Sequence, residues 1–244
     1  MIREYIYNTV KKRAMHFTLI DPDPRKLRNL KEKIRSLEAF GTDAILIGGS
    51  TNVNQSFLDS TIKTIKNTSR IPVMLFPGGL NGLSKYADAL LFMSLMNSKD
   101  PYWITGVQAK GSLSVKEIDV ETIPMAYLIV EPGMKVGEVG KADLIKRKDI
   151  NRAVSYALAA QYLGMALVYL EAGSGANRPV PPEMIRAVKK NIDIPLIVGG
   201  GIRSAKQAKE CVRAGADIIN TGTITEENFS AIREIISVVK NHKK

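Results

Sequence analysis

The chain has 244 residues, 45% of them hydrophobic, which is typical of one folded domain of barrel size and not of a disordered protein. Its single cysteine, Cys211, excludes an internal disulfide framework. The longest apolar stretch, residues 87–96, is too short to span a bilayer, and the N-terminus lacks the apolar run of a signal peptide. We therefore expect a soluble, cytoplasmic protein. The net charge of +11 is scattered over predicted helices without interleaved aromatic residues, which argues against nucleic acid as a partner. A solvated surface or the attraction of a small anionic substrate explains the charge instead.

Short apolar runs alternate with helical patterns from one end of the chain to the other. The runs predict eight parallel strands, over residues 14–20, 44–47, 73–76, 89–93, 125–130, 166–170, 196–198 and 218–220. Apolar residues at three- and four-residue spacing predict helices over residues 24–40, 55–67, 149–163, 182–191, 204–214 and 226–241. This alternation predicts an α/β fold, a single (β/α)8 TIM barrel that forms one domain over residues 1–244; a doubly wound sheet is the main alternative.

Three segments depart from the regular pattern. Residues 79–86 are barely long enough for a helix, so we expect an irregular third helix. Residues 97–119 show no clear pattern. Residues 131–148, rich in glycine and charge, predict a long loop, not a helix, and in a barrel that loop would overhang the active-site face.

Glycine-rich segments follow the sixth, seventh and eighth predicted strands. They comprise residues 169–175 (YLEAGSG), 199–201 (GGG) and 220–223 (NTGT). Glycines allow backbone N–H groups to approach a phosphate closely, and late βα loops form the recurrent phosphate site of TIM barrels. One such cluster would be explained by a tight turn alone, whereas three in succession predict binding of a phosphate monoester.

Acidic and hydroxyl side chains stand at three predicted strand ends. Asp21 follows the first strand and Ser50 the second, and a carboxylate with a hydroxyl is a donor pair that suits Mg²⁺. Asp21 and Asp23 each precede a proline, so both are alternatively explained as turn residues. Glu171 lies two residues after Tyr169 and faces the same way, which makes it a candidate general base or an ordinary ion-pair partner. His16, inside the first strand, is predicted to be a packed residue.

The chain resembles a known family, the geranylgeranylglyceryl phosphate synthases and their bacterial heptaprenylglyceryl phosphate relatives. Five segments carry the resemblance: HFTLIDPD from His16, TDAILIGGS from Thr42, PVMLFPG from Pro72, YLEAGSG from Tyr169 and IVGGGIR from Ile197. The resemblance implies a Mg²⁺-dependent prenyltransferase that joins the C3 hydroxyl of sn-glycerol 1-phosphate to a polyprenyl diphosphate. That reaction releases diphosphate and forms the first ether bond of archaeal-type membrane lipids.

The same resemblance implies roles for individual residues. Asp21 and Ser50 look like the Mg²⁺ ligands, Glu171 would accept the proton of the glycerol hydroxyl, and Tyr169 would be the second catalytic residue. The glycerol phosphate site would comprise Tyr169, Leu170, Glu171, Ala172, Gly173, Ser174, Gly175, Gly200, Gly201, Gly222 and Thr223. Leu19 stands where the bacterial relatives carry a lysine, and with the segment VEPGMKVG from Val130 it resembles the larger archaeal-type group. That group implies a geranylgeranyl donor and a homo-oligomer.

A long prenyl tail needs an apolar groove. The walls of this groove are expected near the third and fourth strand–helix units, which are the irregular ones. The candidates are residues 80–83, Tyr86, Phe92, Met93, Met96, Tyr102 and Trp103, with ordinary core packing as the alternative. The basic charge is also compatible with peripheral binding to anionic membranes.

Other functions stay open at this point. They are a longer or shorter prenyl donor, a phosphate-binding barrel isomerase or lyase, and a catalytically silent phosphometabolite-binding protein. Asp21 paired with Ser50 favours a metal–diphosphate site, which most barrel isomerases do not need.

Overall fold

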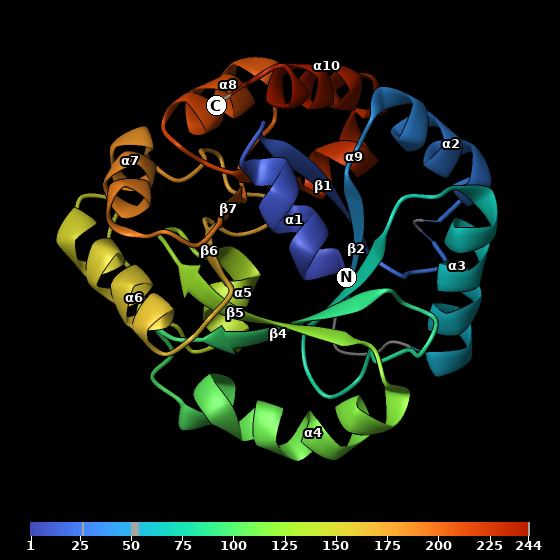
Figure 1. Ribbon diagram of the computed structural model, residues 1–244, viewed down its shortest axis with the longest axis horizontal. Helices are drawn as coiled ribbons and strands as arrows, with labels where there is room; N and C mark the ends of the chain where they lie inside the picture. The colour runs from blue at the N-terminus through green and yellow to red at the C-terminus, as the bar shows by residue number, and fades with distance from the viewer. Residues whose placement is uncertain (26, 50–53, 244) are drawn as a thin grey trace.

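The centre of the molecule is a closed barrel of parallel strands, seen down its axis in Figure 1. The computed structural model describes residues 1–25, 27–49 and 54–243. These residues form eight strands, each paired with the next, with the last closing on the first: β1 Met15–Ile20, β2 Ala44–Gly49, β3 Val73–Pro77, β4 Ala89–Leu95, β5 Glu121–Ile129, β6 Leu167–Glu171, β7 Leu196–Gly199 and β8 Ile218–Thr221. The predicted TIM barrel is therefore confirmed, and the doubly wound sheet is excluded.

Helices surround the barrel on all sides (Figure 1). The outer helices are α2 Leu30–Phe40, α3 Gln55–Thr68, α4 Val107–Ile118, α6 Ile150–Tyr162, α7 Pro182–Asn191, α8 Ala205–Arg213 and α10 Phe229–Lys240. A π-helical turn, η1 Tyr102–Gly106, leads directly into α4. None of the helices in the described part of the chain is long and apolar enough to cross a membrane.

Strand alternation divides the apolar core into two layers. Side chains such as Phe17, Met74 and Met125 fill the barrel interior, whereas Ile45, Leu128 and others pack outward against the helices. Both layers are almost fully buried, as expected for parallel strands covered on both sides. Inward-facing residues near the strand ends therefore converge at the barrel mouth.

Several helix predictions need correction. Residues 131–148 were predicted to be one loop, but they contain a short helix, α5 Met134–Val139. The glycine-rich composition of this segment led to the prediction of a loop. The predicted helix over 226–241 is two helices, α9 Thr223–Glu227 and α10, because the Asn228 side chain caps the second one. The helix predicted from residue 24 begins only at Leu30. In the third unit an irregular helix was expected over residues 79–86, but residues 78–88 form bends and turns and no helix, because the segment is too short for one.

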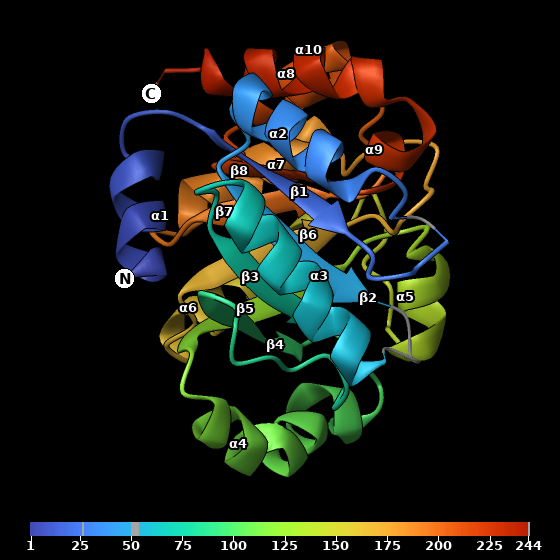
Figure 2. The same ribbon diagram turned by 90° about the vertical axis from the view of Figure 1, so that its right-hand side faces the viewer.

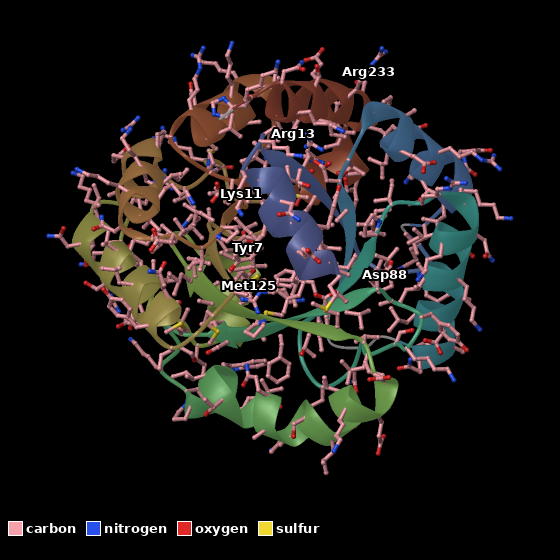
Figure 3. The ribbon with its side chains drawn as sticks, in the orientation of Figure 1. Tyr7, Lys11, Arg13, Asp88, Met125 and Arg233 are labelled. Carbon is pink, nitrogen blue, oxygen red and sulfur yellow. The ribbon has the colours of Figure 1, made fainter. Side chains whose placement is uncertain are left out.

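An additional helix, α1 Ile2–Val10, closes the N-terminal end of the barrel and was not predicted. Figure 2 shows it at one end, with α5 and α9 at the other, and Figure 3 shows the side chains over this end, Tyr7 and Met125 among them. Ile6 and Val10 are buried against the interior layer, and the Glu121 carboxylate accepts hydrogen bonds from the first backbone N–H groups of α1. Because α1 closes the N-terminal end, the opposite, C-terminal end of the barrel is the open one.

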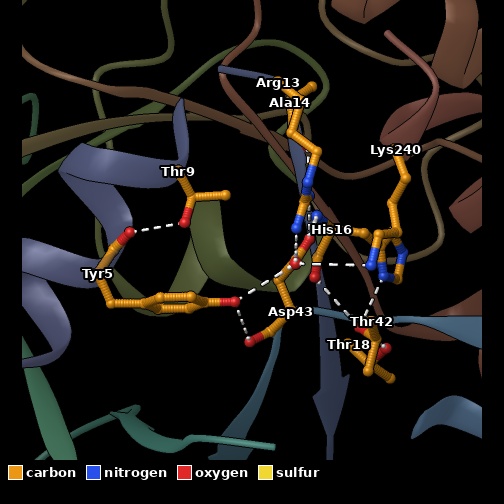
Figure 4. A network of polar contacts seen from close by, with 9 residues as sticks. All are labelled: Tyr5, Thr9, Arg13, Ala14, His16, Thr18, Thr42, Asp43 and Lys240. Carbon is orange, nitrogen blue, oxygen red and sulfur yellow. Dashed lines mark hydrogen bonds and ion pairs between the residues drawn. The ribbon is translucent and has the colours of Figure 1, made fainter. Parts of the chain in front are cut away.

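A polar network fixes the chain between α1 and β1 (Figure 4). The Arg13 guanidinium pairs with the buried Asp43 carboxylate, with 2.6 Å between Nη2 and Oδ1, and the Tyr5 hydroxyl donates to the same carboxylate. Both ring nitrogens of His16 have hydroxyl partners, Thr42 at 2.9 Å and Thr221 at 3.0 Å. Burial lowers the pKa of His16 to about 3, so this histidine is a neutral packed residue, as predicted.

Candidate active site

The glycine-rich segments after β6, β7 and β8 surround one small cavity at the barrel mouth. Its volume is about 40 Å³, and predicted site residues line it: Tyr169, Glu171, Ser174, Gly175, Gly200, Gly201, Gly222 and Thr223. Arg203 brings a cationic side chain to the same cavity and pairs with Glu227 at 3.2 Å. The sequence prediction that these three segments meet is therefore correct.

Glu171, the candidate base, is buried at the end of β6 with only 6% of its surface exposed. Its Oε1 accepts the Gly173 backbone N–H at 2.6 Å, and its Oε2 accepts the Tyr127 hydroxyl at 3.3 Å. Burial raises the pKa of the Glu171 carboxyl, while hydrogen bonds from Tyr169, the Gly173 N–H and Tyr127 hold the increase back. A raised carboxyl pKa beside a cavity at the barrel mouth suits a group that accepts a proton.

Tyr169 and Glu171 point into the barrel from the same face of β6, as their spacing predicts. The Tyr169 ring stacks on Phe76 with centroids 5.8 Å apart and meets the edge of Tyr127 at 5.0 Å. Its hydroxyl accepts a hydrogen bond of 2.7 Å from the Asn220 side-chain amide. Neither Tyr127 nor Asn220 is among the predicted site residues, although Asn220 begins the glycine-rich segment 220–223 and inward alternation along the predicted strands marks both residues.

Three glycines of the site have no space for a side chain. A Cβ on Gly200 would overlap the Glu171 carboxylate and lie 2.6 Å from the Gly173 nitrogen, and one on Gly201 would lie 2.5 Å from the backbone of Arg178. A Cβ on Gly173 would lie 2.7 Å from the backbone of Gly133. All three glycines also adopt a positive φ, which L side chains rarely adopt. The close backbone packing that phosphate binding requires is thus present.

The remaining predicted residues of this region lie in different surroundings. Ser174 and Thr223 are joined by a hydrogen bond of 2.8 Å between their hydroxyls, which ties the loop after β6 to the start of α9. The side chains of Leu170 and Ala172 instead pack in the outer layer, between the barrel and its helices. Only the backbone of these two residues is available to a ligand in the barrel mouth.

A second, larger cavity of about 610 Å³ adjoins the first. The two share five lining residues, Leu19, Ser174, Gly175, Gly222 and Thr223, so a ligand in one can touch a ligand in the other. Asp21, a predicted metal ligand, lines the larger cavity beside Gly48, at the ends of β1 and β2. Ser50, the other predicted metal ligand, lies outside the described residues. Within the described ranges no group of three or more His, Cys, Asp or Glu side chains is arranged to hold a metal ion.

The larger cavity extends outward between β4 and α4 and is mostly apolar. Of the predicted groove walls, Leu80, Leu83, Phe92, Met93 and Trp103 line it. Tyr86, Met96 and Tyr102 do not: Tyr86 and Met96 pack on the outer layer, and Tyr102 packs on Trp103. Lys135, Val136 and Val139 of α5 close another side, so the segment after β5 covers the active-site face, as expected.

Cys211 takes no part in the site. It is fully buried on α8, and burial raises the pKa of its thiol to about 12, so it is an inert core residue, as predicted.

Comparisons with known proteins identify the family of this chain. Residues 7–239 match the profile of the PcrB family. The geranylgeranylglyceryl phosphate synthase of Thermococcus gammatolerans is 55% identical over 226 residues, which cover 93% of this chain and 90% of the relative. The wild-type GGGPS from Thermoplasma volcanium superposes with a TM-score of 0.95 and 45% identity, over 100% of this chain and 99% of that one.

A further solved structure includes a substrate. It is (S)-3-O-geranylgeranylglyceryl phosphate synthase from Thermoplasma acidophilum in complex with sn-glycerol-1-phosphate. This chain is 43% identical to it, with a TM-score of 0.94 and 98% coverage of both chains.

Proposed function

The chain belongs to the PcrB family, and on that premise we propose how its site joins sn-glycerol 1-phosphate to geranylgeranyl diphosphate, with release of diphosphate. The observation that carries the proposal is the position of Glu171. It is buried beside a small glycine-lined cavity that opens into a long apolar one. A barrel isomerase or lyase has no use for an apolar cavity of about 610 Å³, whereas a prenyl donor does.

Glu171 acts as the general base. The phosphate of glycerol phosphate lies against Gly200 and Gly201 and against Gly222 and Thr223. This position leaves the C3 hydroxyl directed toward Glu171. The carboxylate takes the hydroxyl proton as the oxygen bonds to C1 of the prenyl chain, and the C1–O bond to diphosphate breaks. The raised pKa favours this transfer, because a buried carboxylate holds a proton more readily than an exposed one.

Asp21 would hold Mg²⁺ together with Ser50. The donor chemistry fits, since the Asp21 carboxylate borders the larger cavity, and Mg²⁺ is commonly held by one or two protein oxygens completed by substrate phosphates and water. When bound, Mg²⁺ neutralises charge on the departing diphosphate.

Four broader predictions remain part of this proposal: one prenyltransferase domain over residues 1–244, a cytoplasmic location, a homo-oligomer, and peripheral association with anionic membranes. The last is supported by two exposed apolar side chains, Leu80 and Val139, at the edge of the larger cavity, in a chain of net charge +11. Flotation with vesicles is the test. Binding that does not increase with anionic lipid content would contradict it.

The decisive experiment is a transfer assay with labelled sn-glycerol 1-phosphate, Mg²⁺ and geranylgeranyl diphosphate, in which label extracted into organic solvent is counted. Glu171→Gln should lower kcat by about 10²–10⁴-fold, because it removes the base while keeping the side-chain shape. Glu138→Gln, the same exchange at an exposed position of α5, is the matched control. Wild-type turnover by Glu171→Gln would remove Glu171 as the base.

The metal assignment has its own matched pair. Asp21→Asn should raise the Mg²⁺ concentration needed for half-maximal turnover, because it replaces a charged ligand by a neutral one. Asp23→Asn alters a carboxylate two residues further on, which pairs with Arg25 at 2.6 Å, and should leave the Mg²⁺ requirement unchanged. An equal effect of both variants would contradict the role of Asp21.

A further inference from the structure

Asn220 is a buried polar residue of the candidate site, and it has no role in the reaction proposed above. It lies on β8, lines the smaller cavity and is only 4% exposed. Its amide nitrogen donates to the Tyr169 hydroxyl at 2.7 Å, whereas its amide oxygen is buried without a hydrogen-bond partner in the described part of the chain. An unpaired buried oxygen is unfavourable. The benefit of an amide at this position therefore comes from the hydrogen bond of its nitrogen to Tyr169.

The contact with Asn220 sets the direction of the Tyr169 hydroxyl. A phenol has one proton, and an amide NH₂ group can only donate. The Tyr169 oxygen therefore accepts from Asn220, and its own proton remains for another acceptor, which is the Glu171 carboxylate. The ring itself cannot turn aside, because Phe76 stacks on it and the Gly199 backbone lies against its hydroxyl.

We propose that Asn220 is a positioning residue, which acts through Tyr169 and keeps the tyrosine hydroxyl proton directed at the Glu171 carboxylate. This inference rests on the proposed role of Glu171 as the base. In the described structure the titratable groups that act on Glu171 are Tyr127 from β5 and Tyr169 from β6 itself. The facing residues of β7 and β8, Gly199 and Asn220, have no titratable side chain.

Asn220→Asp tests the proposal, because the carboxylate has the same shape but only accepts hydrogen bonds when ionised. The Tyr169 proton would turn toward residue 220, and Glu171 would lose that bond and gain a negative neighbour. We expect kcat to fall about 10- to 100-fold, and the acid limb of the kcat–pH profile to move up by about one unit. The KM for glycerol phosphate should change less than about threefold.

Two further variants separate this role from a structural one. Asn220→Ala removes the amide without offering an acceptor, so its acid limb should move less than half as far as that of Asn220→Asp. In a Tyr169→Phe background, Asn220→Asp should lose most of its effect on the pH profile, because the proton that it redirects is absent. The ¹³C titration of the Glu171 carboxyl, assigned with Glu171→Gln, should show the same shifts without turnover.

The outcomes are distinguishable. An unchanged acid limb in folded Asn220→Asp, equal shifts for Asn220→Asp and Asn220→Ala, or full additivity with Tyr169→Phe would each overturn the positioning role while Glu171 stays the base. Wild-type turnover by Glu171→Gln would instead overturn the base assignment, and the inference with it.

Discussion

Replacing Gly200 by alanine tests whether the turn after β7 holds the base in place. The new Cβ would lie 2.6 Å from the Gly173 nitrogen and 2.9 Å from the Ala172 nitrogen, and it would overlap the Glu171 carboxylate. Ordinary contacts begin at 3.4 Å, so the loop after β6 must move by about 0.8 Å. Both nitrogens belong to the backbone, and no side-chain rotation can relieve the contact.

The expected cost of Gly200→Ala has two parts. Alanine at φ +77 costs about 1–2 kcal/mol, and loss of the hydrogen bond from Gly173 to the Glu171 carboxylate costs about 1.5–3 kcal/mol. The free energy of unfolding should therefore fall by about 2.5–5 kcal/mol. Since misplacement of a reacting group by about 1 Å can lower a rate about 10²-fold, kcat should fall by about that factor.

Gly164→Ala is the matched control. Gly164 has a similar φ of +82 in the turn between α6 and β6, but a Cβ there would meet nothing within 4 Å. It should show only the backbone cost of about 1–2 kcal/mol, with normal turnover. The measurements are chemical denaturation and the extraction assay on both variants. If Gly200→Ala loses no more stability and activity than Gly164→Ala, the close approach of the turn to Glu171 is not what positions the base.

Three further predictions follow from other parts of the molecule. The acid limb of the kcat/KM–pH profile should lie above the ordinary glutamate value of 4.5, because a raised pKa leaves Glu171 protonated, and inactive, at a higher pH; a limb at or below 4.5 would contradict this. Arg13→Met should lower the free energy of unfolding by about 2–3 kcal/mol in urea titrations. This loss is smaller than for a fully buried ion pair, because Arg13 is 26% exposed and Lys240 stays 4.0 Å from Asp43. Turnover should be unchanged, since the pair of Arg13 and Asp43 lies at the closed end of the barrel. Among prenyl diphosphates, kcat/KM should rise from C10 to C20, since each additional buried methylene contributes up to about 0.8 kcal/mol; equal values across the series would show that the apolar cavity does not bind the tail.

Sequence patterns predicted the parts of the fold that depend on local periodicity. The eight strands follow from apolar runs, and the shared orientation of Tyr169 and Glu171 follows from their spacing of two. The same periodicity does not mark α5, where three of the six residues from Met134 to Val139 are glycine or charged. It does not mark α1 either, since only Ile6 and Val10 of that helix are buried.

Contacts between strands were harder to predict than the strands themselves. Tyr127 meets Glu171 because β5 and β6 pair with Tyr127 opposite Tyr169, and this register is a property of the closed barrel. Asn220 reaches Tyr169 across the interior from β8 for the same reason. A single sequence shows which residues face inward, but the closure of the barrel decides which of them touch.

The missing third helix explains how a closed barrel can bind a long apolar chain. In a regular barrel a helix between β3 and β4 would cover the outward side chains of β4, but here residues 78–88 form only turns. The outward-facing Leu90 and Phe92 therefore line the larger cavity, and α4 supplies the opposite wall through Gly111 and Val115. Because apolar walls in contact with water are unfavourable, this cavity favours an apolar ligand over an empty state. Under the proposed function, the irregular unit would place the prenyl tail outside the barrel, with its diphosphate end at the mouth, next to Asp21 and within reach of the smaller cavity.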